Sequence, residues 1–250
     1  MLVGIYNPDL NPLYSTKMSL VTAQKLSEQY KGKPIPEVIA ALAQNYKNVA
    51  FSSSFGQEDQ VLIDVIFKNN LAIEVFTLDT GRLFNETYET FDKTIKRYKK
   101  EIKTYFPDKT KTEELLTKKG PFSFYDSVEN RKECCHIRKV EPLQRALKGK
   151  EIWITGLRSG QSTERENLPL FQWDETYQLI KYNPLAKWSL EQVVEYLKEN
   201  NVPYNPLHDK GFVSIGCAPC TRAIQPGEDI RAGRWWWENS KKECGLHETN

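Results

Sequence analysis

The chain has 250 residues, 39% of them hydrophobic, so it is long enough for one sizeable core and needs no second module. Its 35 basic residues face 33 acidic ones, and a net charge of +2 gives no reason to expect bulk binding to nucleic acid. The sequence holds no secretory leader and no stretch near the roughly 20 apolar residues of a membrane span. We therefore expect a cytoplasmic protein whose thiols stay reduced.

Short apolar runs alternate with amphipathic stretches along most of the chain, and this predicts strands and helices that follow one another. The expected elements are a helical region over 19–46 interrupted at Pro34 and Pro36, strands over 49–52, 73–78, 102–106 and 151–156, and helices over 61–66, 85–99, 111–119, from the cysteine pair at 134 to 147, and over 189–200. Such alternation indicates an α/β fold with a doubly wound, mostly parallel sheet, whose ligands bind at the carboxyl ends of the strands.

We divide the chain into a helical segment over 1–46, an α/β domain over 47–206 and an irregular tail over 207–250 that belongs to the same domain. The tail is rich in Gly, Pro and charge, and its three consecutive tryptophans, 235–237, need apolar surface to cover. We interpret these tryptophans as packing anchors and expect the tail to lie over the carboxyl edge of the sheet.

A serine-rich turn follows the first predicted strand. Ser52, Ser53, Ser54 and Gly56 offer hydroxyls and backbone N–H groups at a helix N-terminus, where the helix dipole favours anions. The turn lacks the Walker pattern, so hydrolysis of a nucleoside triphosphate is not indicated. A serine-rich strand end is also an ordinary helix cap, and the motif alone leaves both interpretations open.

The five cysteines form a tandem pair, Cys134 and Cys135, a CxxC pair, Cys217 and Cys220, and a lone Cys244. The first four could bind zinc or a [4Fe–4S] cluster. Adjacent cysteines suit a cluster with several iron corners better than one tetrahedral ion, which favours the cluster. The alternatives are that the tandem pair is merely small and buried, or that the CxxC pair is a redox centre.

Cys244 differs from the other four because no hydrophobic periodicity surrounds it. Lys241 and Lys242 stand beside it, and nearby cations raise the thiolate fraction of a thiol, so we interpret Cys244 as a nucleophile. An incidental cysteine in a disordered tail is the alternative. By the same reasoning His208 and His247 are predicted to be polar surface residues rather than metal ligands.

Basic residues gather beside the thiols. Such clusters usually form a solvated face, but their position next to thiolates favours an anionic substrate. The two clusters comprise Arg131, Lys132, Arg138 and Lys139, and then Arg231, Arg234, Lys241 and Lys242.

Together these motifs resemble the assimilatory sulfonucleotide reductases, the adenylylsulfate/phosphoadenylylsulfate reductase family, over roughly residues 40–250. The resemblance implies an adenine nucleotide α-hydrolase-like fold with a modified pyrophosphatase (PP) loop. It is carried by the segments 52–59 and 78–82, by Cys134 and Cys135 with Lys139, by 156–158 with Gln161, Ser162 and Arg165, by 217–222, and by 243–247.

The resemblance also implies roles for individual residues. The serine-rich turn would hold the phosphosulfate, and Leu78 and Thr80 would line the adenosine pocket. Cys134, Cys135, Cys217 and Cys220 would hold a [4Fe–4S] cluster, with Lys139 as the link between cluster and sulfate. The full set expected to bind substrate is Ser52, Ser53, Ser54, Gly56, Leu78, Thr80, Lys139, Arg158, Arg165, Arg231, Arg234 and His247.

The implied reaction is the thioredoxin-dependent reduction of adenylylsulfate (APS) to sulfite and AMP through a thiosulfonate on Cys244. A separate thioredoxin or glutaredoxin would be the electron donor, because no thioredoxin-like region is visible. Members with four cluster cysteines mostly prefer adenylylsulfate, so we expect that substrate. A dimer or tetramer is expected from the resemblance.

Three alternatives remain at this point. The first is a reductase of 3′-phosphoadenylylsulfate (PAPS), or one that accepts both nucleotides. The second is a PP-loop transferase such as a tRNA-thiolating enzyme, although its usual Ser-Gly-Gly-x-Asp-Ser turn differs from residues 53–59. The third is a cluster-binding sensor without enzymatic activity, in which Cys244 would be dispensable.

Overall fold

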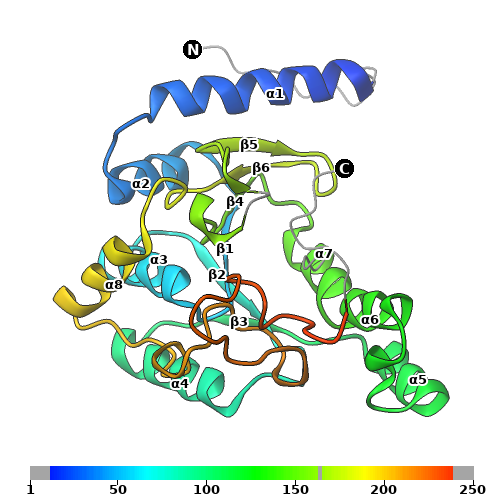
Figure 1. Cartoon of the computed structure of the whole chain (residues 1–250). Coiled ribbons are helices and arrows are strands. Elements are labelled where there is room, and N and C mark those ends of the chain that lie inside the picture. Colours follow the sequence, from blue (N-terminus) through cyan, green and yellow to red (C-terminus); the bar gives the residue numbers. More distant parts are fainter. Residues whose placement is uncertain (1–11, 163–164, 239–250) are drawn as a thin grey trace.

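A computed structural model describes residues 12–162 and 165–238, with the backbone alone for residues 12–18. Its centre is a six-stranded sheet in the order β3-β2-β1-β4-β6-β5, and only the β5–β6 pairing is antiparallel. Helices flank this sheet on both sides (Figure 1), which confirms the predicted doubly wound, mostly parallel α/β fold.

The strands are β1 (Val49–Ser53), β2 (Glu74–Leu78), β3 (Lys103–Tyr105), β4 (Ile152–Ile154), β5 (Phe171–Asp174) and β6 (Leu179–Tyr182). The helices are α1 (Pro12–Gln29), α2 (Ile35–Asn45), α3 (Gln57–Lys68), α4 (Asn85–Tyr98), α5 (Lys109–Lys119), α6 (Val128–Cys135), α7 (Glu141–Leu147) and α8 (Leu190–Glu199).

Side chains of the central strands alternate between two apolar layers, as the pleat of a strand requires. Phe51 of β1 and Ile154 of β4 belong to a large core that is packed by α2, α3 and α8. Ala50 and Trp153, their neighbours in sequence, face the other way and pack against α7. Because both faces of the sheet are covered, its central strands carry apolar residues on both faces before their polar carboxyl ends, which is typical of parallel sheets.

The hairpin of β5 and β6 at the edge of the sheet was not among the predicted elements. Alternation of Phe171 and Trp173 with polar residues is the sequence signal that could have revealed it. Helix α1 lies along β5 (Figure 1), and the hydroxyl of Ser27 is hydrogen-bonded to both the carbonyl and the amide of Phe171. This contact covers polar backbone groups that an edge strand would otherwise expose.

The tandem cysteines lie at the end of a helix, and the prediction that they begin one was wrong. Helix α6 begins earlier, where the side chain of Ser127 caps it by accepting a hydrogen bond from the amide of Asn130 at 3.1 Å. A π-helical turn, His136–Val140, follows the pair and joins α6 to α7. Pro142 in the first turn of α7 has no N–H to donate, so the regular hydrogen-bond ladder is interrupted here.

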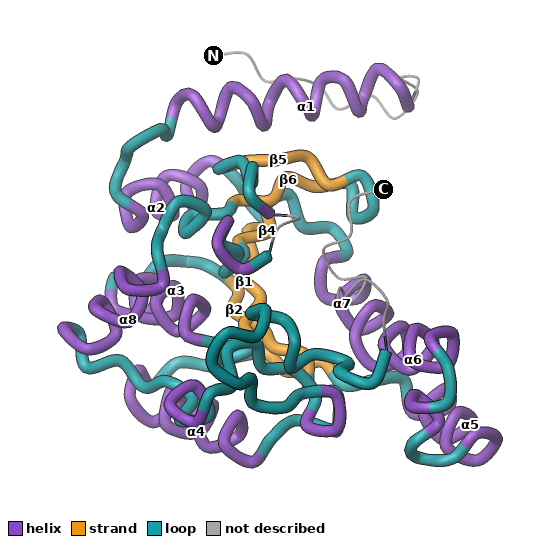
Figure 2. The backbone as a smooth tube through the Cα atoms, in the orientation of Figure 1, coloured by secondary structure: helices purple, strands orange, loops and turns teal. Residues whose placement is uncertain are grey.

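The described part of the tail, residues 207–238, consists of turns and short 3₁₀ segments with one isolated bridge between Thr221 and Arg234, and Figure 2 shows it mainly as loop. Trp235 is 1% exposed, and Trp237 packs on the rings of Phe124 and Tyr125, so both serve as packing anchors. Trp236 is 40% exposed.

The three-part division of the chain stays a prediction. No helix in the described ranges has the length and apolarity to cross a membrane.

Candidate active site

A cavity of about 520 Å³ lies at the carboxyl ends of β1, β2 and β4. The strand order reverses between β1 and β4, and ligands of open α/β sheets bind at such a switch point. Tail residues 213–216 and 230–234 close the other side, where we expected the tail to lie. Every predicted substrate residue in the described ranges lines this cavity: Ser52, Ser53, Ser54, Gly56, Leu78, Thr80, Lys139, Arg158, Arg165, Arg231 and Arg234. Cys244 and His247 lie outside the described residues.

The turn after β1 leads into helix α3 at the wall of the cavity. Phe55 takes a left-handed backbone (φ 61°), is 1% exposed, and stacks its ring on Phe91. Its amide donates to the hydroxyl of Ser53 at 3.0 Å. Gly56 is the N-cap of α3, and no side chain caps the helix there. The serines therefore do not act as an ordinary helix cap, and the first N–H groups of α3 remain suited to an anionic ligand.

Asp59, in the first turn of α3, holds the serine turn in place. Its Oδ2 accepts hydrogen bonds from the amide of Ser54 at 2.6 Å and from the hydroxyl of the same residue at 2.7 Å. Burial raises the pKa of Asp59 to about 7, even though both bonds from Ser54 act in the opposite direction. The carboxyl group also lies against Gly156, where an added Cβ would stand 2.1 Å from Oδ1, so this position requires glycine.

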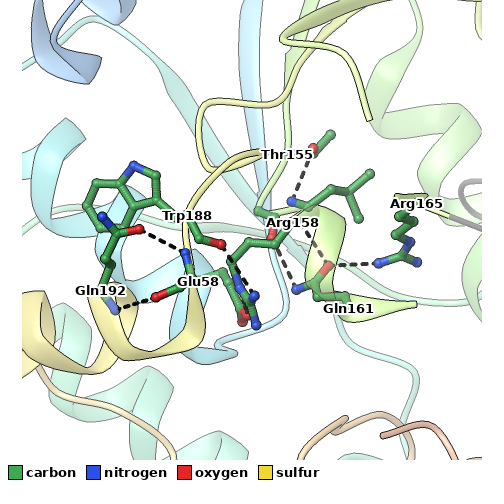
Figure 3. Close-up of polar contacts among 10 residues, drawn as sticks. Glu58, Thr155, Arg158, Gln161, Arg165, Trp188 and Gln192 are labelled. Carbon is green, nitrogen blue, oxygen red and sulfur yellow. Dashed lines mark hydrogen bonds and ion pairs between the residues drawn. The ribbon is translucent and has the colours of Figure 1, made fainter. Parts of the chain in front are cut away.

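A chain of polar contacts fixes the arginines of the loop that follows β4 (Figure 3). The guanidinium of Arg158 donates through Nε to Glu58 at 2.8 Å, in an ion pair whose side chains are 7% and 14% exposed. Gln161 accepts hydrogen bonds from the amide of Arg158 at 3.1 Å and from the guanidinium of Arg165 at 2.8 Å. Two guanidinium groups are thereby held at the cavity wall, where they suit an oxyanion.

The tail supplies two further arginines to the same wall. Arg234 is 5% exposed, and its guanidinium lies over the ring of Trp235 at 4.6 Å and donates to the hydroxyl of Ser214 at 3.4 Å. A Cβ on Gly216 would approach this guanidinium to 2.4 Å, so glycine there makes room for Arg234. Arg231 lines the cavity nearby.

The four predicted metal-binding cysteines line a second, smaller cavity together with basic and aromatic side chains. Lys139 lines both cavities. The remaining members of the small cavity's lining are Arg82, Phe124, Arg131 and Arg138. All four thiols are free of disulfides, and Cys134, Cys217 and Cys220 are buried. We refer to this second, smaller cavity as the thiol cavity.

The thiol cavity holds the donor atoms of a metal centre. Four free thiols, three of them buried, surround one space, and four thiolates are the donor set shared by tetrahedral zinc and by iron–sulfur clusters. Within residues 12–162 and 165–238, no three His, Cys, Asp or Glu side chains converge closely enough to hold one ion. A tetrahedral zinc would need all four sulfurs within roughly 2.3 Å of one point, whereas a cluster binds each sulfur at a separate corner.

The surroundings shift the pKa values of the buried thiols in different directions. Burial by itself would raise the pKa of Cys217, but the charge of Lys139, the nearby Thr80 hydroxyl at 3.3 Å and the charge of Arg234 together lower it. Burial raises the pKa of Cys134, and burial with the charges of its neighbouring thiolates raises the pKa of Cys220 to about 12. Of these three thiols, Cys217 is the one whose surroundings favour the thiolate.

His208 was expected on the surface, and this prediction was wrong. It is half-buried and lines the large cavity, and burial lowers its pKa despite the charge of Glu58, so the imidazole is neutral at pH 7. Glu58, Asp59 and Gln161 were not among the predicted site residues either. They stood within the recognised motifs, but their contacts depend on residues distant in the sequence, such as Arg158 for Glu58.

The fold is an α/β fold of the adenine nucleotide α-hydrolase-like class. Its backbone superposes on phosphoadenylyl-sulfate (PAPS) reductase from Candida auris, in a phosphate complex, with a TM-score of 0.70 and 31% identity, over 80% of this chain and 96% of that one. Residues 48–223 match the phosphoadenosine phosphosulfate reductase domain family. The chain therefore belongs to this family.

Curated relatives extend the similarity over most of the chain. An adenosine 5′-phosphosulfate reductase from Allochromatium vinosum is 48% identical over 212 residues, which are 84% of this chain and 83% of the relative. A protein of the same name from Agrobacterium fabrum is 52% identical over 79% of this chain and 76% of its own. One from Burkholderia cepacia is 46% identical over 93% of this chain and 94% of its own.

Proposed function

We propose that the protein is an adenylylsulfate reductase that converts adenylylsulfate to sulfite and AMP with electrons from a dithiol. The observation that carries this proposal is the lining of the large cavity, where the serine turn, Leu78, Lys139 and the arginines converge on one space. The relatives named as adenosine 5′-phosphosulfate reductases, at 46–52% identity, support the same substrate. Family membership leaves no support for a PP-loop transferase or a non-enzymatic sensor.

In the proposed first step, the thiolate of Cys244 attacks the sulfur atom of the substrate. A bond forms between Sγ and that sulfur, the bond from sulfur to the bridging phosphate oxygen breaks, and AMP leaves with the electron pair. The product is a thiosulfonate on Cys244. A thiolate of the donor then attacks Sγ of Cys244, which forms a mixed disulfide and releases sulfite with the electrons of the broken S–S bond. The second donor thiolate attacks the donor sulfur of this mixed disulfide, which closes the donor's disulfide and releases the thiolate of Cys244.

The described residues supply the environment for this step. A negative thiolate approaches a negative sulfonyl group, so the encounter requires nearby positive charge. Lys139, Arg158 and Arg165 line the cavity on the side of the sheet, and Arg231 and Arg234 line it on the side of the tail. These groups would screen the repulsion between the ions and stabilise charge that develops on the departing phosphate, while the N-terminus of α3 binds anionic oxygens.

We further propose that Cys134, Cys135, Cys217 and Cys220 hold a [4Fe–4S] cluster. When bound, the cluster would supply fixed charge beside Lys139 rather than electrons. Lys139 lines both cavities and lowers the pKa of Cys217, so it can respond to charge on either side. Iron and acid-labile sulfide in a ratio near one, in protein purified without oxygen, would support the cluster, whereas one zinc per chain would contradict it.

The proposed donor is a separate thioredoxin or glutaredoxin, and the proposed assembly is a homo-oligomer, a dimer or tetramer. Size-exclusion chromatography with light scattering tests the assembly directly. We place the protein in the cytoplasm, because the proposed reaction consumes reduced thiols that this compartment maintains.

The test of the function is a sulfite assay on protein purified without oxygen, with thioredoxin as donor and with adenylylsulfate and its 3′-phosphorylated form in parallel. Turnover of adenylylsulfate at least about tenfold faster, roughly 1.4 kcal/mol in the barrier, supports the proposal. Equal rates would indicate a reductase for both nucleotides, an alternative favoured by the structural similarity to a PAPS reductase. Absence of sulfite from either nucleotide would overturn the proposed function.

A further inference from the structure

In the serine turn, the hydroxyl oxygen of Ser52 accepts a hydrogen bond. The indole Nε1 of Trp153, in β4, lies 2.8 Å from the hydroxyl oxygen of Ser52, at the end of β1. Trp153 is 1% exposed, and both Trp153 and Ser52 line the large cavity. An indole N–H can only donate, so the oxygen of Ser52 accepts and the hydroxyl proton of Ser52 remains available to donate elsewhere.

The hydroxyl group of Ser54, two residues later, acts instead as a hydrogen-bond donor. Its hydroxyl donates to Oδ2 of Asp59 at 2.7 Å, and the same oxygen also accepts the amide of Ser54 at 2.6 Å. With its proton thus engaged, the hydroxyl of Ser54 offers lone pairs rather than a proton. The two serines therefore offer different hydrogen-bonding groups to a ligand. The hydroxyl of Ser52 can donate to an anionic oxygen, and the hydroxyl of Ser54 can accept from a donor group.

The ring of Trp153 is held by the β5–β6 hairpin. The ammonium of Lys181 lies 4.9 Å from the centre of the indole, and the ring of Tyr177 meets it edge-on at 5.5 Å. Lys181 forms an ion pair with Asp174, and the two side chains are 1% and 4% exposed. A buried ion pair depends strongly on its geometry, so Lys181 is constrained and in turn constrains the indole.

We propose that Trp153 is a positioning residue that fixes the hydroxyl of Ser52 as a hydrogen-bond donor to the anionic part of the bound nucleotide. The β5–β6 hairpin holds the indole in the required orientation, although Asp174, Tyr177 and Lys181 do not themselves line the cavity. The identity of the nucleotide rests on the proposed function, whereas the direction of the hydrogen bond follows from the chemistry of the indole.

The test compares AMP with adenosine, which lacks the anionic group, by calorimetry on the whole protein. Trp153→Phe keeps an aromatic ring and removes the N–H, and Ser52→Ala removes the hydroxyl. We expect each variant to weaken AMP binding by about five- to tenfold and adenosine binding by less than about twofold. The double variant should bind AMP no more weakly than Ser52→Ala alone, because Trp153 acts through Ser52.

Trp173→Phe is the matched control, since Trp173 also has a buried indole N–H but lies in β5 and does not line the cavity. We expect it to leave AMP binding unchanged. Unchanged AMP binding in Trp153→Phe, or equal losses for AMP and adenosine, would overturn the inference. If Trp153→Phe does not fold, unchanged AMP binding in Ser52→Ala overturns it instead. If the variants bind AMP and adenosine as expected but the wild-type protein forms no sulfite, only the proposed function is contradicted.

Discussion

The large cavity and the thiol cavity meet at Lys139 but are built on different principles. The large cavity is lined by serine hydroxyls and by arginines that acidic side chains hold in place. Ser54 donates a hydrogen bond to Asp59, and Arg158 donates one to Glu58. The thiol cavity is lined by cysteines, cations and the ring of Phe124. A ligand that exchanges needs a preformed wall, whereas a group held permanently can complete the wall that surrounds it.

Cys244→Ser should produce the largest effect while changing neither cavity. Loss of the proposed nucleophile is expected to lower sulfite release by roughly 10³-fold or more, because no other described thiol lines the large cavity. The measurement is sulfite formation together with mass spectrometry of the protein after adenylylsulfate is added. AMP affinity and iron content serve as controls and should match the wild type. Sulfite release at the normal rate would refute the mechanism.

Cys134→Ser should damage the thiol cavity alone. Cys134 is buried, and serine is a poorer ligand for iron than a thiolate, so we expect the bound iron and the visible absorbance of a cluster to be lost. AMP affinity should stay within about threefold of the wild type, because Cys134 does not line the large cavity. Full retention of iron would contradict the proposed role of Cys134 as a ligand.

Gly156→Ala should damage the large cavity alone. The new Cβ would stand 2.1 Å from Oδ1 of Asp59, so the carboxylate must move and release Ser54. We expect the free energy of unfolding to fall by about 1–3 kcal/mol and AMP binding to weaken, with iron content unchanged. Chemical denaturation measures the first effect and calorimetry the second. In an Asp59→Ala background the same substitution should cost less, and full additivity would contradict the proposed clash.

The pH dependence of stability should reveal the buried carboxyl group of Asp59. Burial raises the pKa of Asp59 to about 7, above the value of about 4 in an unfolded chain. The folded state therefore holds this proton more tightly. The stabilising contribution is full below about pH 4 and is lost as the pH rises through 7.

Unfolding measured from pH 4 to 8 should show this trend as a difference between wild type and Asp59→Asn. The wild type should lose stability relative to the variant as the pH rises, by an amount of the order of a few kcal/mol. Asp92→Asn, in which an exposed carboxylate of α4 is neutralised, is the control for removing one charge. A difference that does not change with pH would show that the Asp59 carboxyl group is not perturbed.

The amino-acid sequence by itself determined the class of fold and many of the residues that line the two cavities. Alternating apolar runs predicted the parallel strands, because periodicity is a local property that tertiary contacts rarely reverse in buried strands. The motifs named residues that fall together because the carboxyl ends of parallel strands share one edge, so the order of the elements already implied that Ser52, Leu78 and Arg158 would be neighbours.

Only the tertiary structure decided how those residues are held. The cysteine pair lies at the end of α6 rather than at the start of a helix, because the cap at Ser127 and the proline of α7 set the helical boundaries. The β5–β6 hairpin places Lys181 against Trp153, and Trp153 determines which way the hydroxyl of Ser52 can donate. These contacts join residues about 30 to 100 positions apart, and no local pattern encodes the direction of a hydrogen bond between such partners.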